Sequence, residues 1–430
     1  MTNARDTIYA LATAPGKAGV AVVRISGPDA PRVLTDLAGD PPPPRMMSLR
    51  RIVDSGELID RALVVRFRAG ASFTGEELAE LHLHGGRAVV ERLLGALSSR
   101  GLRLAEPGEF TRRAFEAGSL DLTQVEALAD LIDAETETQR RQAVAVAEGA
   151  LSTIVADLKQ EAQGALALME ASIDFADEED APEDVSAPVD AALRRITVRL
   201  KEMLEGAEIA RDVREGFRVA LIGPPNVGKS SLINALTKSE TSIVSPYAGT
   251  TRDVMSRQTN VGGLAVTFLD TAGIRDATDP VERIGVERAR SSAIEAHLRI
   301  HMRSVDTIDE AQEDLLRSGD IRVWAKADLS DGPGDLSISV HDDVSIERLR
   351  DMVLACLIDE TPPATLVAHR RQAERLEHAL AHVKQAEAME ETELRAHHLR
   401  EALRELSGLI GEVDIEDVLG DIFSRFCIGK

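Results

Sequence analysis

The sequence predicts a multidomain protein, part α/β and part α, in which a nucleotide-binding domain is inserted into a discontinuous helical domain. A phosphate-binding motif, G-x-x-x-x-G-K-[ST], occupies residues 223–230 between a strand-like apolar run and a helical stretch. Residues 214–363 alternate strand and helix patterns, as a mostly parallel sheet with crossover helices requires. Helical patterns over 119–213 and 364–430 flank this segment. Residues 1–118 form a separate α+β pattern, so we expect three domains.

The composition limits the number of domains, the cellular compartment and the partners that we expect for this chain. At 430 residues and 43% hydrophobic content, the chain has material for about two to four domains. It lacks an apolar run of the roughly 18 residues that a membrane span needs, so no membrane association is expected. Its two cysteines, Cys356 and Cys427, suit a reducing cytoplasmic compartment. The net charge of −23 opposes nucleic-acid binding by bulk electrostatics, so any RNA contact requires a local basic patch or a basic partner.

The sequence of the N-terminal domain predicts short strands that are separated by turns containing glycine and proline. The strand-like runs are residues 7–12, 20–25, 62–67 and 80–84. The last run alternates polar and apolar side chains, so His82 and His84 share one strand face. Because no third ligand stands at metal-motif spacing, surface or hydrogen-bonded histidines are favoured over a metal site.

The flanking segments have the period of amphipathic helices. One helix face is formed by Leu122, Val125, Leu128, Ala129 and Ile132. An alanine-rich helix is expected over 143–168, and an acidic solvated turn over 174–184. A single further helix, about 187–213, leads to the phosphate loop, and residues 365–427 are helical again.

The nucleotide-binding motifs predict a GTPase. In the phosphate loop, successive backbone N–H groups hold phosphate oxygens, Lys229 reaches the terminal phosphates, and Ser230 offers its hydroxyl to Mg²⁺. A strand at 264–269 delivers the D-x-x-G motif, which places Asp270 near the metal and Gly273 near the terminal phosphate. Between these motifs, a threonine within A-G-T-T-R-D can close over the metal. The predicted GTP-binding residues are Asn226, Val227, Gly228, Lys229, Ser230, Ser231, Ser245, Thr250, Thr251, Asp270, Gly273, Lys326 and Asp328.

Base recognition is expected from the segment that resembles N-K-x-D. Asp328 can accept two hydrogen bonds from guanine, and the stem of Lys326 can pack over the base. Ala325 replaces the usual asparagine, which costs on the order of 1 kcal/mol and should weaken affinity while keeping guanine preference. Ser339 is a candidate for the last nucleotide-contacting loop.

Two features of this domain depart from ordinary GTPases. Ile274 follows D-x-x-G and cannot orient a water molecule, so Glu282, Arg275 or an ion must supply the missing interaction, or hydrolysis is very slow. The segment 297–304 stands where a central apolar strand belongs, yet it alternates arginine and histidine with apolar residues. This polarity predicts a GTPase domain that is less stable or less active than its relatives.

The whole chain resembles the MnmE (TrmE) family of tRNA-modifying GTPases. The stretches that carry the resemblance are residues 8–14, 24–27, 73–76, 84–86, 107–111, 223–230, 248–253, 281–285 and the ending F-C-I-G-K at 426–430. The resemblance implies a homodimer joined through the N-terminal domains. It implies a flavoprotein partner, MnmG (GidA), in a heterotetramer or larger complex, and tRNA as substrate. Together the two proteins would add a (carboxymethyl)aminomethyl group to C5 of the wobble uridine.

The resemblance also implies cofactors and their residues. A one-carbon unit from 5-formyl- or methylene-tetrahydrofolate would be bound by Arg24, Glu80 and Lys430, while Ser119 stands where the family has a lysine. Mg²⁺ would be held by Ser230 and Thr251. K⁺ would replace an arginine finger between facing GTPase domains, with ligands at Asn226, Ser245, Tyr247 and Thr250. By the resemblance, Glu282 would position the attacking water. Without the resemblance, the sequence is equally compatible with Glu282 as an ordinary acidic residue at a helix N-terminus. Cys427 is either a nucleophile or a buried thiol.

Two other functions compete with this interpretation. The first is a ribosome-assembly GTPase, which shares the phosphate loop and the G-T-T segment. Such a protein usually carries a basic RNA-binding appendage, which is not visible in this sequence, and it would have no function for residues 1–118. The second is a non-catalytic regulatory module that binds nucleotide and signals by dimer rearrangement, which is compatible with Ala325 and the polar strand.

Overall fold

The computed structural model describes residues 6–174, 185–238, 256–270, 290–307, 315–358 and 366–413, together with 419–420, 422–423, 426 and 428–429. The chain falls into two compact units. The first contains residues 1–129, 146–193 and 381–430, and the second contains residues 130–145 and 194–380. The domain boundaries expected near residues 118, 213 and 363 remain predictions.

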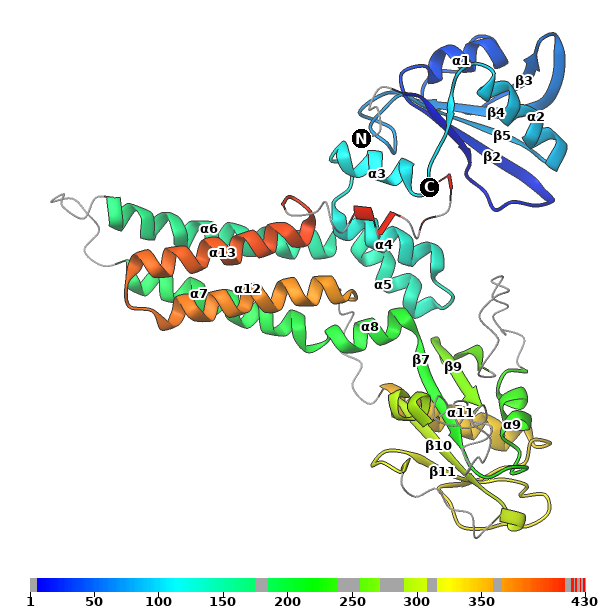
Figure 1. Ribbon diagram of the computed structural model, residues 1–430, viewed down its shortest axis with the longest axis vertical. Helices are drawn as coiled ribbons and strands as arrows, with labels where there is room; N and C mark the ends of the chain where they lie inside the picture. Colours follow the sequence, from blue (N-terminus) through cyan, green and yellow to red (C-terminus); the bar gives the residue numbers. More distant parts are fainter. Residues whose placement is uncertain are drawn as a thin grey trace, which may run out of the picture. The chain divides into compact units, whose positions relative to one another are not determined.

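The N-terminal part of the first unit is a mainly antiparallel sheet with two helices on one face (Figure 1). Its strands are β1 (Ile8–Leu11), β2 (Ala18–Ser26), β3 (Ser48–Asp54), β4 (Glu57–Phe67), β5 (Leu78–Gly85) and β6 (Arg103–Leu104), in the order β3-β4-β5-β2-β1-β6. Helices α1 (Ala30–Ala38) and α2 (Arg87–Ser98) bury Val33, Leu34 and Leu93 against this sheet. The strands predicted at 7–12, 20–25 and 80–84 are confirmed within about two residues at their ends, whereas the strand predicted at 62–67 ends as predicted but begins five residues earlier, at Glu57.

Helices follow this sheet and return after the second sheet. They are α3 (Glu109–Glu116), α4 (Leu122–Asp133), α5 (Glu137–Ala147), α6 (Ala150–Asp174), α7 (Ser186–Glu205), α8 (Ala207–Glu215), α12 (Arg370–Ala388) and α13 (Thr392–Ile410). In the first unit α6 and α13 lie side by side (Figure 1), and Arg400 of α13 forms an ion pair with Glu170 of α6 at 2.9 Å. On α4, Leu122 and Val125 are fully buried, whereas Ile132 at the far end of the predicted face is 39% exposed.

Two predicted helices have the wrong extent. The helix expected over 143–168 is interrupted at Gly149, whose φ of 88° lies in the left-handed region that glycine adopts without a Cβ penalty. The single helix expected over about 187–213 is two helices, α7 and α8, because Gly206 leaves the helical conformation with φ −102° and ψ 2°. The apolar period continues through both breaks, so it gave no sign of either.

The second unit contains a mostly parallel sheet, as predicted. Its strands are β7 (Phe217–Ile222), β8 (Ser256–Val261), β9 (Leu264–Asp270), β10 (Leu298–Arg303), β11 (Ile321–Trp324) and β12 (Leu336–Ser337), in the order β12-β11-β10-β7-β9-β8. Neighbouring strands are parallel except the β8–β9 hairpin. Helices α9 (Lys229–Leu236) and α11 (Asp343–Ile358) contribute Leu232, Leu236 and Leu349 to the core on one face. A short 3-10 helix, η1 (Val305–Thr307), follows β10.

The polar side chains of the central strand β10 have a buried partner that the sequence pattern did not reveal. Asp320, whose side chain is 1% exposed, accepts hydrogen bonds from Arg299 at 2.9 Å and contacts Nε2 of His301 at 3.1 Å. Burial alone would raise the pKa of Asp320, but hydrogen bonds from Arg299, the Arg317 backbone and His301 lower it below its ordinary value. Burial lowers the pKa of His301. The strand therefore buries a compensated cluster, and the expectation of a weakened domain remains a prediction.

We expect Asp320→Asn to lower the free energy of unfolding by about 3 kcal/mol at pH 7, because it leaves the Arg299 charge buried without its counter-ion. Folding favours the carboxylate of Asp320 and the neutral form of His301, so both contributions are present at neutral pH and are lost on acidification. Denaturant unfolding monitored from pH 7 down to about pH 2 measures the effect, because the His301 contribution is lost below about pH 6.5 and the Asp320 contribution only below about pH 3.8.

The matched control is Arg322→Gln on the neighbouring strand β11. Arg322 is 64% exposed, pairs with Asp335, and should change stability by less than about 0.5 kcal/mol. Equal stabilities of wild type and the Asp320 variant would show that the cluster contributes nothing.

Candidate nucleotide-binding site

The backbone of the phosphate loop takes conformations that its sequence permits. Asn226 has a φ of 62° and Gly228, immediately before α9, has a φ of 110°. A Cβ on Gly223 would lie 2.7 Å from the carbonyl oxygen of Met302 at the end of β10, so a larger residue cannot occupy this position. The loop therefore turns sharply from β7 into the N-terminus of α9, where free N–H groups and the helix dipole favour an anion.

Lys229 is held over this loop. Its side chain is buried, and its Nζ donates hydrogen bonds to the carbonyl oxygens of Gly223 at 2.7 Å and Pro224 at 2.9 Å. Burial lowers the pKa of Lys229, and the nearby charge of Asp270 opposes that shift. The ammonium group is thus positioned beside the anion-binding N-terminus by contacts within the loop itself.

Ser230 and Asp270 form the candidate magnesium site. The Ser230 hydroxyl donates to Oδ2 of Asp270 at 2.6 Å, which joins the start of α9 to the end of β9. The other carboxylate oxygen, Oδ1, is buried and has no hydrogen-bonding partner among the described residues. A buried carboxylate oxygen without a partner is costly, and Mg²⁺ prefers such oxygen ligands, so the residues present fit this ion.

A cleft of about 200 Å³ lies beside the loop and has the composition of a base pocket. Its walls include Val227, Gly228, Ala325, Lys326, Asp328 and His341. Oδ1 of Asp328 accepts a hydrogen bond from the Ser339 hydroxyl at 2.8 Å, and this bond lowers the pKa of Asp328. The carboxylate therefore stays ionised and is an acceptor for N–H groups of a base.

Lys326 and Ala325 shape this cleft in different ways. Lys326 has a φ of 58°, and its Nζ forms an ion pair with Asp306 of η1 at 2.9 Å. Ala325 is 5% exposed and packs in the core, so its methyl group offers no hydrogen bond where the usual asparagine would. Asp306 was not found from the sequence, because it follows β10 in an irregular segment without a motif.

The predicted site residues are only partly described. All the described ones belong to the second unit. Ser231, Lys326 and Asp328 line the cleft, and Asp270 contacts Ser230 of the phosphate loop. The residues that lie outside the described part are Ser245, Tyr247, Thr250, Thr251, Gly273, Ile274, Arg275, Glu282, Cys427 and Lys430.

The predicted folate residues Arg24 and Glu80 lie together in the first unit. They stand opposite each other on β2 and β5, and their side chains form an ion pair at 2.9 Å. The Arg24 guanidinium also lies 5.5 Å and 5.6 Å from the ring centres of Phe73 and Phe110. Gly429 approaches this sheet, because a Cβ on it would lie 2.2 Å from the carbonyl oxygen of Leu11.

The paired histidines of β5 have carboxylate neighbours. Nε2 of His82 lies 3.3 Å from Glu80, and Nδ1 of His84 lies 2.8 Å from Asp60. Within the described residues, no cluster of three or more histidine, cysteine or acidic side chains is arranged to hold a metal ion. In the same part of the chain, no helix is long and apolar enough to cross a membrane.

The fold of the second unit and its loop define a P-loop nucleotide-binding protein of the GTPase class. Residues 7–119 match the family described as GTP-binding protein TrmE N-terminus, and residues 122–427 match the MnmE helical domain. The tRNA modification GTPase MnmE of Paracoccus denitrificans is 47% identical over 428 residues, covering 99% of this chain and 100% of the relative. The protein of the same name from Cereibacter sphaeroides is 48% identical over 431 residues, with the same coverage.

Among solved structures, the G domain of the T. maritima FeoB iron transporter covers 33% of this chain and 98% of its own, at 21% identity and a TM-score of 0.27. The two MnmE proteins are nearly 50% identical to this chain over its full length, which is enough to assign the family. The chain belongs to the MnmE family of tRNA modification GTPases.

We expect Lys229→Ala to reduce GTP hydrolysis by at least about a hundredfold, because it removes a positive charge placed for the terminal phosphates. The fold should survive, since the Lys229 ammonium contacts only the loop carbonyls of Gly223 and Pro224 in the described residues. The matched control is Lys238→Ala, an exposed lysine just after α9, which should keep the wild-type rate. Phosphate release measured with both variants decides the point, and wild-type turnover in the Lys229 variant would overturn the assignment of the loop.

Proposed function

We propose that this chain is a GTP-hydrolysing enzyme of tRNA modification. The main structural support for GTP hydrolysis is that Lys229, Ser230 and Asp270 lie together at the N-terminus of α9. Membership of the MnmE family supports the tRNA part.

The residues of the phosphate site suggest how each group would act on GTP. Backbone N–H groups of the loop would hold the phosphates, and Lys229 would offset the negative charge that develops as the terminal phosphate leaves. Ser230, Asp270 and Thr251 would hold Mg²⁺, which supplies further positive charge at the same phosphates. Asp328 and Lys326 would hold the guanine base in the adjoining cleft.

The same proposal assigns K⁺ to the loop. Asn226 is exposed at the tip of the loop, and its side-chain amide has no hydrogen-bonding partner among the described residues, so its oxygen is free to bind a cation. Ser245, Tyr247 and Thr250 would complete the site, and a K⁺ there would supply positive charge beside the transferring phosphate. Glu282 would position the attacking water, since Ile274 cannot. Two GTPase domains facing each other across this surface would exclude water from the site.

The modification itself is proposed to need the first unit and a partner. Arg24 and Glu80, with Lys430, would hold a 5-formyl- or methylene-tetrahydrofolate. The approach of Gly429 to β1 supports this proposal, because it brings the chain end to the sheet that carries the other two residues. A homodimer with the flavoprotein MnmG (GidA), in a heterotetramer or larger complex, would then modify C5 of the wobble uridine in a cytoplasmic pool of tRNA.

A second candidate function is a regulatory module that binds nucleotide without turnover. Ala325 favours it, because the base cleft lacks the amide that would strengthen guanine binding. Measured turnover separates the two functions.

We expect GTP hydrolysis to be at least about tenfold faster in KCl than in NaCl at equal ionic strength, because the smaller ion does not fit the same ligands. Asn226→Ala should remove this response while GTP affinity changes by less than about twofold, since nucleotide binding depends on the backbone and Lys229. Asn234→Ala, an exposed asparagine on α9, is the matched control and should behave as wild type.

Equal rates in the two salts across a protein dilution series would contradict the K⁺ mechanism. Absence of turnover in both salts, with GTP still bound, would support the regulatory module instead.

A further inference from the structure

The charge of this acidic chain is unevenly distributed. Residues 1–118 contain 16 lysines and arginines and 14 aspartates and glutamates, a net charge of +2 in a chain whose total is −23. The remaining residues therefore carry −25. Residues 1–118 are therefore the part of the chain whose net charge does not repel a polyanion.

Within this sheet the positive charge is concentrated in one element, which we call the basic hairpin: residues 45–68, comprising β3, β4 and their flanks. Its arginines outnumber its carboxylates by six to three. The arginines are Arg45, Arg50, Arg51, Arg61, Arg66 and Arg68.

The carboxylates of the basic hairpin are engaged elsewhere. Asp54 pairs with Arg92 at 2.7 Å and Arg100 at 2.8 Å, and Asp60 contacts His84 at 2.8 Å. Among the described residues, none of the six guanidinium groups contacts a carboxylate, although the backbone N–H of Arg61 donates to Asp60; the guanidinium groups of Arg50 and Arg66 donate to the backbone carbonyls of Asp40 and Pro42. The positive charge of the basic hairpin is thus uncompensated within this part of the chain.

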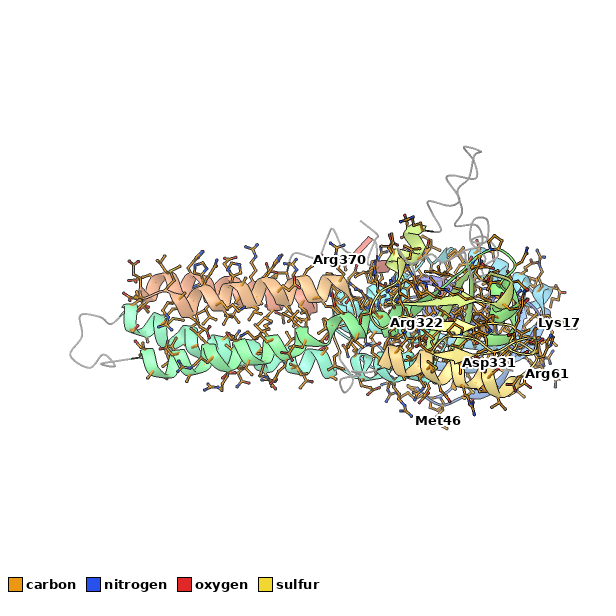
Figure 2. All side chains as sticks on the ribbon, turned by 90° about the horizontal axis from the view of Figure 1, so that it is seen from below. Lys17, Met46, Arg61, Arg322, Asp331 and Arg370 are labelled. Carbon is orange, nitrogen blue, oxygen red and sulfur yellow. The ribbon has the colours of Figure 1, made fainter. Side chains whose placement is uncertain are left out.

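The pairing of the two strands places part of this charge on one face. Arg51 stands directly opposite Arg61, and Leu49 stands opposite Leu63. All four side chains are exposed, and they alternate with Ile52, Ala62 and Val64, which are buried against α1 and α2. Met46 and Arg61 extend outward from the ribbon (Figure 2). Two like charges directly opposite each other destabilise a strand pair by roughly 0.2–1 kcal/mol, and a bound anion removes that cost.

We propose that the basic hairpin is a docking surface for the phosphate backbone of tRNA. This inference rests on the proposed function, which makes tRNA a substrate. The Arg51–Arg61 face presents exposed guanidinium groups, which can bind phosphate oxygens in bidentate fashion, and Leu49 and Leu63 offer apolar area for riboses. Residues 45–68 lack tryptophan and tyrosine, so bases have little to stack on and the surface should bind RNA without reading its sequence.

The positive charge of the basic hairpin makes a second copy of this chain or an acidic protein a less favourable occupant than tRNA. A second copy of the chain joined by a twofold axis through this face would bring the same arginines against each other, which costs energy. An acidic partner protein also meets the charge, but in a chain proposed to act on tRNA a polyphosphate backbone meets it with more negative charge for the same area.

Binding of fluorescein-labelled, unmodified tRNA transcript to the full-length protein, followed by anisotropy over a salt series, tests this proposal. Wild type should bind with a steep salt dependence, and Arg51→Gln/Arg61→Gln/Arg68→Gln should bind at least about tenfold more weakly, with the log–log salt slope reduced by about 2 to 3. Lysine at the same three positions should restore the salt slope but only part of the affinity, because lysine keeps the charge and cannot bind a phosphate in bidentate fashion.

The matched control is Arg32→Gln/Arg87→Gln, two exposed arginines of α1 and α2 that already pair with Asp29 and Glu91, and it should bind tRNA as wild type does. Circular dichroism and the GTP hydrolysis rate verify that each variant is folded. Equal affinity of the glutamine variant and wild type overturns the docking surface and leaves the proposed function intact. A wild type that binds no tRNA at any salt concentration refutes the tRNA part of the proposed function itself. A change of oligomeric state in light scattering, without loss of tRNA binding, assigns the face to a second copy and overturns the proposal.

Discussion

The close approach of Gly223 to the end of β10 is the constraint on which the nucleotide site depends. Because a side chain at Gly223 would collide with the Met302 carbonyl, the loop can leave β7 only along a glycine backbone. This path places Lys229 at the first turn of α9 and lets Ser230 reach Asp270 across from β9. The same strand end leads into η1, where Asp306 holds Lys326 beside the base cleft. The phosphate and base sites are therefore set by one strand end.

Much of the fold follows from local sequence patterns. The apolar runs predicted β7 before the loop and β9 before Asp270, and the motifs predicted that Ser230 and Asp270 would meet, because both act on one metal. The helix breaks at Gly149 and Gly206 were missed, since the alanine-rich period is continuous through them. The partner of Arg299 was missed for a different reason: Asp320 lies in a turn whose position depends on how β11 packs beside β10. Long-range polar contacts of this kind have no periodic signature.

Ionic interactions have different roles in the two units. In the second unit, Arg299, His301 and Asp320 are buried together and compensate one another, so polarity in a central strand is compatible with a packed sheet. In the first unit, Arg51 and Arg61 of the basic hairpin are exposed, while Asp54 pairs with Arg92 and Arg100 and Asp60 contacts His84. Uncompensated charge at a surface costs little stability and remains available for binding. Under the docking proposal, this distribution would give an acidic chain a local surface for a polyanionic substrate.

The central claim, that a phosphate site built on Ser230 and Asp270 serves tRNA modification, is tested most directly in cells. Wobble nucleosides of tRNA from cells lacking this protein are measured by mass spectrometry, with wild type or Asp270→Ala supplied in trans. The account predicts that the aminomethyl-type group at C5 of the wobble uridine disappears in the deletion strain, returns with wild type, and stays absent with the Asp270 variant. Unchanged wobble modification in the deletion strain, or full restoration by the Asp270 variant, would contradict it.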